Sequence, residues 1–326
     1  MTKVAIIAGG PSSEAAVSRV SASAVQAALA TAGHAPVVLE LDGTLPSRLL
    51  ALAPEVAFPV AHGPVGEDGC LQGLLEVLDL RYVGCDVRAS ALAASKPHAK
   101  VHFSAAGLPV APQVLVSRCD DLAAAAHRAR DELGASVVVK PASGGSAIGV
   151  SRIAPTNGLD RLVEALATAL RVDDSVLVER FFAGHEVTCG VLDVDDTGPQ
   201  ALPPTLITSH AAEWYDFTSR YAKGGSSHQC PAPYDASLLQ RIQRIAVAGF
   251  RALGARDLGR LDFVVGSDGS VTLLELNTLP GMTATSLYPE AASVAGIPFP
   301  ELCHRLVARA LSRPLRQAPD VVPMPP

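Results

Sequence analysis

Two carboxylates and one amide are the side chains of this sequence best suited to bind a metal ion. Asp262, Glu275 and Asn277 lie in two β-type runs, residues 259–265 and 270–277. These runs flank a Gly-Ser-Asp-Gly turn, which is typical of a hairpin. Oxygen-only ligands suit Mg²⁺ or Mn²⁺, whose coordination phosphate oxygens usually complete.

The hairpin register decides which side chains share a face. A four-residue loop would pair Gly266 with Val271, and counting back along each strand sets the polar residues opposite one another. Because side chains alternate, we expect one polar and one apolar face. The polar face holds Arg260, Asp262, Glu275 and Asn277, and the apolar face holds Leu261, Phe263, Leu274 and Leu276. A solvated face with an ordinary Arg–carboxylate pair is the alternative interpretation.

A lysine followed by a glycine-rich segment forms the second candidate site. Lys140 ends a Val-Val-Val run, and the next residues are small, among them Gly144, Gly145 and Ser146. Such a loop presents backbone N–H groups to an anion, while the lysine adds a point charge on phosphate. The Walker A spacing is absent. Alone the loop is also typical of a plain connection, but beside a carboxylate hairpin it indicates a nucleotide with a metal ion.

Three further segments carry polar residues. Glu14 lies in the first turn of a helix that follows a Gly-Gly pair, where a carboxylate binds an ammonium or merely favours the helix dipole. His62 ends a later β-type run and suits a core histidine as well as a ligand. The polar segment 211–229, which contains Tyr215, Asp216 and Tyr221, exceeds the usual connection length, and this predicts a mobile lid or disorder.

Composition excludes several classes of protein. The 326 residues are 48% hydrophobic and 18% charged, which argues against disorder. The net charge of −6 argues against a nucleic-acid partner. No apolar run approaches the ~18 residues that span a bilayer, so no membrane partner is expected. The opening MTKVAIIAGG is too short for a signal-peptide core, and the six scattered cysteines predict reduced thiols in a cytoplasmic protein.

Strands and helices alternate along the chain, the pattern of an α/β fold. A fourth strand of the first domain is predicted at residues 82–85, and one helix at residues 89–106 follows it. We expect a first domain, a central α+β module, a hairpin-bearing domain and a proline-rich tail. Their boundaries are 1–90, 91–182, 183–313 and 314–326.

Taken together, these residues resemble the D-alanine–D-alanine ligases of the ATP-grasp superfamily, from about residue 3 to residue 310. Five blocks carry the resemblance. They are Gly9-Gly10-Pro11-Ser12-Ser13-Glu14, the His62-to-Gly73 run, Lys140-Pro141 with Gly145-Ser146, Tyr215-Asp216 with Tyr221 and Cys230-Pro231-Ala232, and Gly259 to Asp262 with Glu275 to Thr283. The resemblance implies a Rossmann-like parallel-sheet domain, a central α+β lid domain and a C-terminal α+β domain.

The resemblance also implies an activity: two D-alanines joined through an acyl phosphate, for peptidoglycan synthesis, with ATP and two Mg²⁺ or Mn²⁺ ions. The implied catalytic residues are Glu14, Ser146, Tyr221, Arg260 and Gly281. His62, Ser286 and Leu287 would bind substrate. ATP would contact Lys96, Lys140, Glu179, Arg180, Phe181, Phe182, Glu186, Arg220 and Leu274. The metal ligands would be Asp262, Glu275 and Asn277, and a homodimer is expected.

The sequence departs from the family pattern at a few positions. Ala15 and Ala16 stand where the family usually has Arg and Glu. Gly144 and Ala147 replace Glu and Ser, and arginines replace lysines at 180 and 220. Arginine keeps the charge but binds as a fork. The alternative function is therefore a paralogous ATP-grasp amino-acid ligase of secondary metabolism or antibiotic resistance with a shifted substrate.

Overall fold

The N-terminal unit is a small parallel sheet between helices. A computed structural model describes residues 1–210, 225–283 and 285–314. The unit contains β1 (Lys3–Ala8), α1 (Ala15–Thr31), β2 (Ala35–Glu40), α2 (Leu45–Leu52), β3 (Val56–Pro59) and α3 (Cys70–Val77). The strand order is β2-β1-β3. Alternation along β1 buries Ile6 against α1 and Ile7 against α2 and α3, so both faces of the sheet are covered.

The predicted fourth strand at residues 82–85 is wrong. Tyr82 makes only an isolated parallel bridge to Ala57. Beyond it, the N–H of Gly84 donates to the carboxylate of Asp257 at 2.7 Å instead of to a neighbouring strand. The chain therefore leaves the sheet at this point.

The central unit is a four-stranded antiparallel sheet of order β4-β7-β5-β6. Its strands are β4 (Gln113–Ser117), β5 (Val137–Pro141), β6 (Ser151–Ile153) and β7 (Ser175–Arg180), and its helices are α6 (Leu122–Leu133) and α7 (Leu159–Ala169). Valines from three of the strands pack against alanines and leucines of the two helices. The amphipathic helices thus cover one face of the sheet and leave the other for the site.

The predicted single helix at residues 89–106 is two helices, α4 (Val87–Ala94) and α5 (Lys96–Ala105). Ser95 between them is extended and bridges Ser143. Pro97 lies in the first turn of α5, where its missing N–H costs nothing. The break lets the Lys96 N–H donate to the Ala142 carbonyl at 2.9 Å, which brings α5 against the glycine-rich loop.

The C-terminal unit is built on a six-stranded sheet, ordered β11-β10-β8-β12-β13 with β9 paired to β8. The strands are β8 (His185–Asp193), β9 (Gln200–Ala201), β10 (Thr205–Ser209), β11 (Ser226–Gln229), β12 (Asp257–Val265) and β13 (Val271–Asn277). The helices are α9 (Ala236–Ala252), α10 (Leu287–Val294) and α11 (Phe299–Ser312). Because β11 pairs with β10, the end of the predicted loop 211–229 is a strand.

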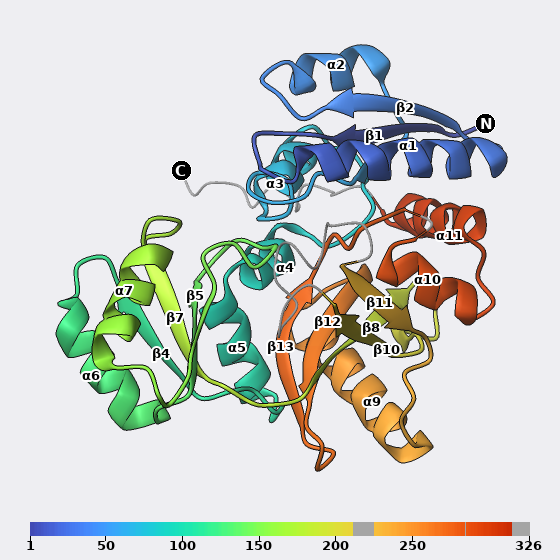
Figure 1. Ribbon diagram of the computed structural model, residues 1–326. Helices are drawn as coiled ribbons and strands as arrows, with labels where there is room; N and C mark the ends of the chain where they lie inside the picture. Colours follow the sequence, from blue (N-terminus) through green and yellow to red (C-terminus); the bar gives the residue numbers. More distant parts are fainter. Residues whose placement is uncertain (211–224, 284, 315–326) are drawn as a thin grey trace, which may run out of the picture.

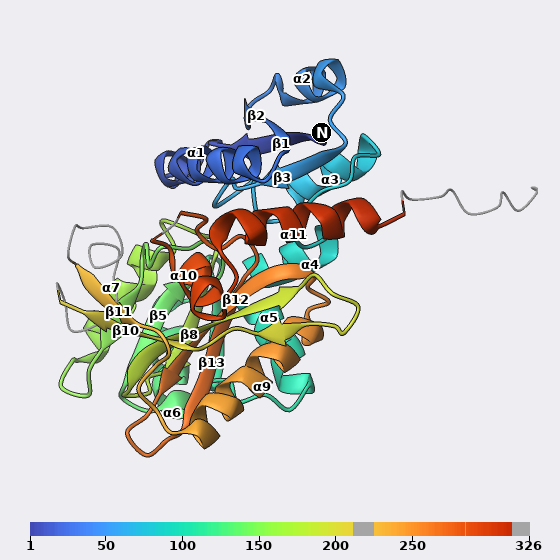
Figure 2. The same cartoon turned by 90° about the vertical axis from the view of Figure 1, so that its right-hand side faces the viewer.

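The last helix returns to the N-terminal unit. In Figures 1 and 2, α11 lies against the N-terminal sheet on the side of α1. Leu302, Leu306 and Val307 share one apolar core with Val25 and Leu29 of α1. The two ends of the described chain are therefore packed together. No helix in the described ranges is long and apolar enough to cross a membrane.

Candidate active site

A cavity of about 340 Å³ lies where the three units meet. Its walls come from the segment before α1, the loop after β5, the end of β7, the start of α5 and strand β13. The predicted site residues on these walls are Glu14, Lys96, Lys140, Ser146, Glu179, Arg180, Phe181, Phe182, Glu186, Leu274 and Glu275. A second cavity of about 360 Å³ shares Lys96 and Glu275 with the first and adds Asn277. Segments far apart in sequence thus form one continuous site.

The register of the β12–β13 hairpin differs from the prediction next to the turn. Val265, rather than Gly266, pairs with Val271. A shift between Asp262 and Phe263 then moves the ladder by one residue. The predicted pairs farther from the turn are confirmed: Asp262 with Glu275, and Arg260 with Asn277.

The same bulge turns Leu274 toward the cavity. Leu273 takes the core position and is fully buried, while Leu274 is half-buried and lines the cavity beside Glu275. The predicted apolar face that grouped Leu274 with Leu276 is therefore wrong. A bulge allows two consecutive residues to oppose one partner, which accounts for the change of face.

Arg260 and Asp262 form a two-pronged ion pair on β12. Arg260 donates from Nε to Oδ1 at 2.8 Å and from Nη2 to Oδ2 at 2.9 Å. Thr188 on β8 donates to the same Oδ1 at 2.8 Å. The fork fixes both side chains in one orientation. Oδ2 accepts one of these bonds and keeps a lone pair for a further partner.

Glu275 and Lys96 connect the hairpin to the glycine-rich loop. Lys96 Nζ lies 3.4 Å from Glu275 Oε2 and donates to the carbonyl of Gly144 at 2.6 Å. Asn277 Oδ1 accepts the N–H of Leu279 at 3.1 Å, which orients the amide. Three expected site residues from two units thus line one stretch of the second cavity.

Lys140 belongs to a buried cluster that the sequence did not predict. Glu179 on β7 contacts both Lys140 and Lys100, and all three are less than a tenth exposed. Burial acts to raise the pKa of Glu179, but the two ammonium groups outweigh it and hold that pKa below its usual value. Burial lowers the pKa of Lys100. The i, i+4 spacing of Lys96 and Lys100 is the sequence feature that could have shown a shared helix face.

The wall around the end of β7 is aromatic. Phe181 and Phe182 line the cavity, and the guanidinium of Arg152 lies over the Phe181 ring at 4.1 Å from its centre. Arg152 also lines the cavity and was not predicted. The predicted Arg180 donates to the Leu133 carbonyl at 3.1 Å. Flat apolar rings beside cationic groups suit a planar base.

Glu14 and Ser146 bring the N-terminal unit to the glycine-rich loop. Ser146 Oγ donates to Glu14 Oε1. Ser12 supports this position, because its Oγ donates to the His62 carbonyl at 2.7 Å and accepts the Glu14 N–H at 3.2 Å. Gly63 must be glycine here, since its φ is +80° and a Cβ would lie 2.8 Å from that of Ser12.

His62 is buried beside this pair. Within the described part of the chain, its Nε2 has no hydrogen-bond partner. Burial lowers the pKa of His62, and nearby Arg260 lowers it further, whereas Glu14 raises it. A neutral imidazole with a spare polar atom therefore lies within electrostatic reach of both a carboxylate and a guanidinium.

Glu67 is a further residue of the site to which the sequence assigned no role. It lines the second cavity, and burial together with Glu14 raises its pKa to about 8. The Gly63 N–H and Lys96 lower that pKa but do not outweigh the rise. It lies in the motif that begins at His62, yet only the fold shows which charges surround it.

Gly281, Ser286 and Leu287 form a turn that begins α10. Ser286 Oγ accepts the Thr283 N–H at 3.1 Å and lies 2.7 Å from Thr283 Oγ1. A Cβ on Gly281 would lie 3.0 Å from Ser286 Oγ, so these residues are in close contact. Leu287 is buried. The predicted Arg220 and Tyr221, like Tyr215 and Asp216, lie outside the described residues.

Comparisons with known proteins identify the family of the chain. The family model described as D-ala D-ala ligase C-terminus matches residues 102–308, and the model for the D-ala D-ala ligase N-terminus matches residues 44–85. A D-alanine–D-alanine ligase of Desulforamulus reducens is 42% identical, covering 95% of this chain and 99% of its own.

Solved structures show the same architecture. The D-alanine–D-alanine ligase of Bacillus anthracis in complex with ATP is 29% identical with a TM-score of 0.81, covering 95% of this chain and 98% of that one. The VanG D-Ala:D-Ser ligase of Enterococcus faecalis is 28% identical with a TM-score of 0.80, covering 95% and 99%. The fold is therefore the ATP-grasp fold, and the chain belongs to the D-alanine–D-alanine ligase family.

Proposed function

We propose that this chain uses ATP to join two D-alanines into D-alanyl-D-alanine for peptidoglycan synthesis, and that the two adjoining cavities hold the reactants. One observation carries the proposal. Glu14, a carboxylate suited to an ammonium, is hydrogen-bonded to Ser146 of the anion-binding loop on a cavity that also holds two lysines and Glu275. An amino acid and a polyphosphate would meet there.

The ATP side consists of the first cavity. Lys96 and Lys140 would contact phosphates, and Arg180, Phe181, Phe182, Glu186 and Leu274 would surround adenine and ribose. Glu179 binds Lys140 and Lys100, so part of its role is to fix the ammonium that meets the phosphate. Arg220, outside the described residues, is expected on the same side.

The metal ligands suit Mg²⁺ or Mn²⁺. Asp262, Glu275 and Asn277 provide hard oxygen donors, and Asp262 Oδ2 keeps a lone pair beside its bond to Arg260. Two ions are expected, with phosphate oxygens completing their coordination. When bound, they would neutralise charge on the transferred phosphoryl group.

The first step activates a carboxylate. Glu14 would hold the ammonium of the first D-alanine, and Ser146 orients Glu14. One carboxylate oxygen attacks the γ-phosphorus, the bond to ADP breaks, and an acyl phosphate forms. Tyr221 is expected to extend this link from outside the described residues. Exclusion of water is needed, because water would hydrolyse the acyl phosphate.

The second step forms the peptide bond. The amine of the second D-alanine attacks the acyl carbon, loses a proton and expels phosphate. Arg260 and the Gly281 N–H would stabilise the oxyanion. Ser286 and Leu287, at the N-terminus of α10, would receive the second carboxylate, and His62 would contact the incoming amino acid.

Assembly and location complete the proposal. We expect a homodimer in the cytoplasm, which light scattering after size exclusion and cell fractionation would test. The six cysteines are free thiols, and disulfides are rare in cytosolic proteins.

Phosphate release measured with ATP, Mg²⁺ and D-alanine, together with mass detection of the dipeptide, tests the activity directly. Turnover with D-alanine and little with D-serine or D-lactate is the expected result. Turnover with another amino acid but not with D-alanine would favour the paralogous ligase instead.

A further inference from the structure

A buried carboxylate lies outside the site, at the start of β12. Asp257 is 1% exposed and adopts φ +64°, a left-handed conformation that side chains rarely take. Burying an ionised carboxylate is costly unless it is paired. A strained backbone and a buried charge at one position indicate a residue held for its interactions.

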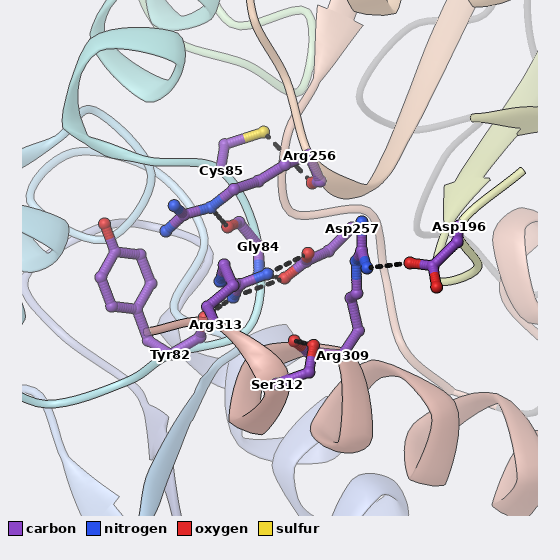
Figure 3. A network of polar contacts seen from close by, with 9 residues as sticks. All are labelled: Tyr82, Gly84, Cys85, Asp196, Arg256, Asp257, Arg309, Ser312 and Arg313. Atoms are coloured by element: carbon purple, nitrogen blue, oxygen red, sulfur yellow. Dashed lines mark hydrogen bonds and ion pairs between the residues drawn. The ribbon is translucent and has the colours of Figure 1, made fainter. Parts of the chain in front are cut away.

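Three segments of the chain meet at this carboxylate (Figure 3). Arg313, just after α11, contacts both oxygens, with Nη2 3.0 Å from Oδ2. The Gly84 N–H donates to Oδ2 at 2.7 Å, and Arg256 Nε donates to the Gly84 carbonyl at 2.9 Å. Arg313 also donates to the Tyr82 carbonyl. We call Tyr82, Gly84, Arg256, Asp257 and Arg313 the clasp.

The clasp is anchored rigidly on the N-terminal side. The Ala57 N–H donates to the Arg81 carbonyl at 2.8 Å, and the Val83 N–H donates to the Ala57 carbonyl at 2.9 Å. Arg81 Nε in turn donates to the Arg313 carbonyl at 2.8 Å. Gly84 therefore follows directly from a segment tied to β3, and β3 leads to His62.

The other side of the clasp is the strand that carries the oxyanion-binding arginine. Asp257 precedes Arg260 by three residues on β12, and β12 is paired on both edges, with β8 and β13. Because β12 is hydrogen-bonded along both edges, the position of Asp257 also determines the position of Arg260. The phosphate-binding Lys140 on β5 and its partner Glu179 on β7 lie on a separate sheet, whereas Glu186 and Leu274 lie on β8 and β13.

We propose that the Asp257–Arg313 pair is a positioning element, which fixes the N-terminal unit against β12 and thereby aligns the two halves of the amino-acid site. Glu14 and His62 form one half and Arg260 the other, an assignment that rests on the proposed function. Bidentate geometry supplies direction as well as attraction, whereas the apolar packing of α11 on α1 alone permits sliding.

Steady-state kinetics on four variants test this positioning role. Asp257→Asn and Arg313→Gln should raise KM for D-alanine by about tenfold, the scale of a small misalignment, while KM for ATP changes less than about twofold. Arg313→Lys keeps the charge without the fork and should show a smaller rise. Arg309→Gln is the matched control, because Arg309 lies in the last turn of α11, four residues before Arg313, and pairs with the exposed Asp196.

Hydrogen exchange provides a readout independent of turnover. The Gly84 amide should exchange faster in Asp257→Asn and Arg313→Gln than in Arg309→Gln. If a single variant fails to fold, Arg313→Lys and the double variant Asp257→Asn/Arg313→Gln, which leaves no buried charge unpaired, apply the same test. Equal changes of both KM values, or unchanged D-alanine kinetics with an exposed Gly84 amide, would overturn the proposal. Failure of the wild-type chain to ligate D-alanine would overturn the proposed function instead.

Discussion

Strand β12 contributes to two arginine–aspartate pairs with similar geometry and different origins, since Arg313 of the second pair follows α11. Arg260 and Asp262 are two residues apart on one strand, so alternation alone puts them on one face. Asp257 and Arg313 are 56 residues apart, and only the return of α11 to the N-terminal unit joins them. In the first pair both side chains are partly exposed, Arg260 at 11% and Asp262 at 16%. In the second pair the Asp257 carboxylate is buried, at 1% exposed, while the Arg313 side chain is 22% exposed.

The same kind of ion pair can serve a ligand site or hold structural units together. An ion pair at a ligand site can lose one of its hydrogen bonds when a ligand binds, because the remaining lone pairs and water replace the lost bond. A carboxylate as deeply buried as that of Asp257 has no such substitute, so its ion pair holds structure in place. Variants of each ion pair separate these two roles.

The largest effect is expected at the site pair. Asp262→Asn removes a charged metal ligand. It should raise the activation barrier by several kcal/mol and so lower turnover about 10³-fold, with little loss of folding stability. Phosphate-release assays and thermal unfolding would measure both. Asp268→Asn, an exposed residue in the turn of the same hairpin, is the control. A rate near that of the wild type would remove Asp262 from the metal site.

Breaking the Asp257–Arg313 pair should affect folding stability more than breaking the Arg260–Asp262 pair. Arg313→Gln leaves the Asp257 carboxylate buried without its cation, which should lower the free energy of unfolding by about 3–5 kcal/mol. Arg260→Gln should cost clearly less, because the Asp262 side chain is 16% exposed and that of Asp257 only 1%. Urea denaturation of both variants measures the difference. Equal losses would show that the two pairs do not differ in the way described.

The lysine cluster should position the ATP side of the site, as the clasp positions the amino-acid side. Lys100→Met removes one of the two cations on Glu179, so that Lys140 loses its fixed position. KM for ATP should rise by about tenfold while KM for D-alanine stays near the wild-type value. Lys3→Met, at an exposed lysine, is the matched control. A rise in KM for D-alanine alone would contradict the separation of the two sides.

The smallest effect is a pH dependence. The pKa of Glu67 is raised to about 8, so folding favours its protonated form. Its contribution to stability is full below the unfolded pKa, near 4.5, and is lost as pH rises through about 8. In Glu67→Gln this loss disappears, so the unfolding temperature should fall less between pH 5 and 8.5. The exposed Glu132→Gln should keep the wild-type slope.

Local patterns predicted much of the site. The Asp-Gly turn and strand alternation were enough to place Asp262 opposite Glu275, although two errors offset each other. The register was displaced by one residue at the turn, and the bulge at Leu274 displaced it back. A bulge depends on how β13 packs, which the order of residues does not reveal.

Long-range pairing was beyond the sequence. Nothing near Lys100 indicates Glu179, and nothing near Asp257 indicates Arg313, because the partners meet only after sheets and helices pack. The strand expected at residues 82–85 failed for the same reason, since Gly84 is committed to Asp257. The break at Ser95 had a local cause in Pro97 that could have been weighed.

The fate of one oxygen atom shows whether the reaction passes through an acyl phosphate. If the first D-alanine is activated as an acyl phosphate, D-alanine labelled with ¹⁸O in its carboxylate must transfer one labelled oxygen to inorganic phosphate for each dipeptide formed. Mass spectrometry of the released phosphate would show this label. Dipeptide formed with unlabelled phosphate would rule out the acyl phosphate, and labelled phosphate without dipeptide would rule out ligation of D-alanine.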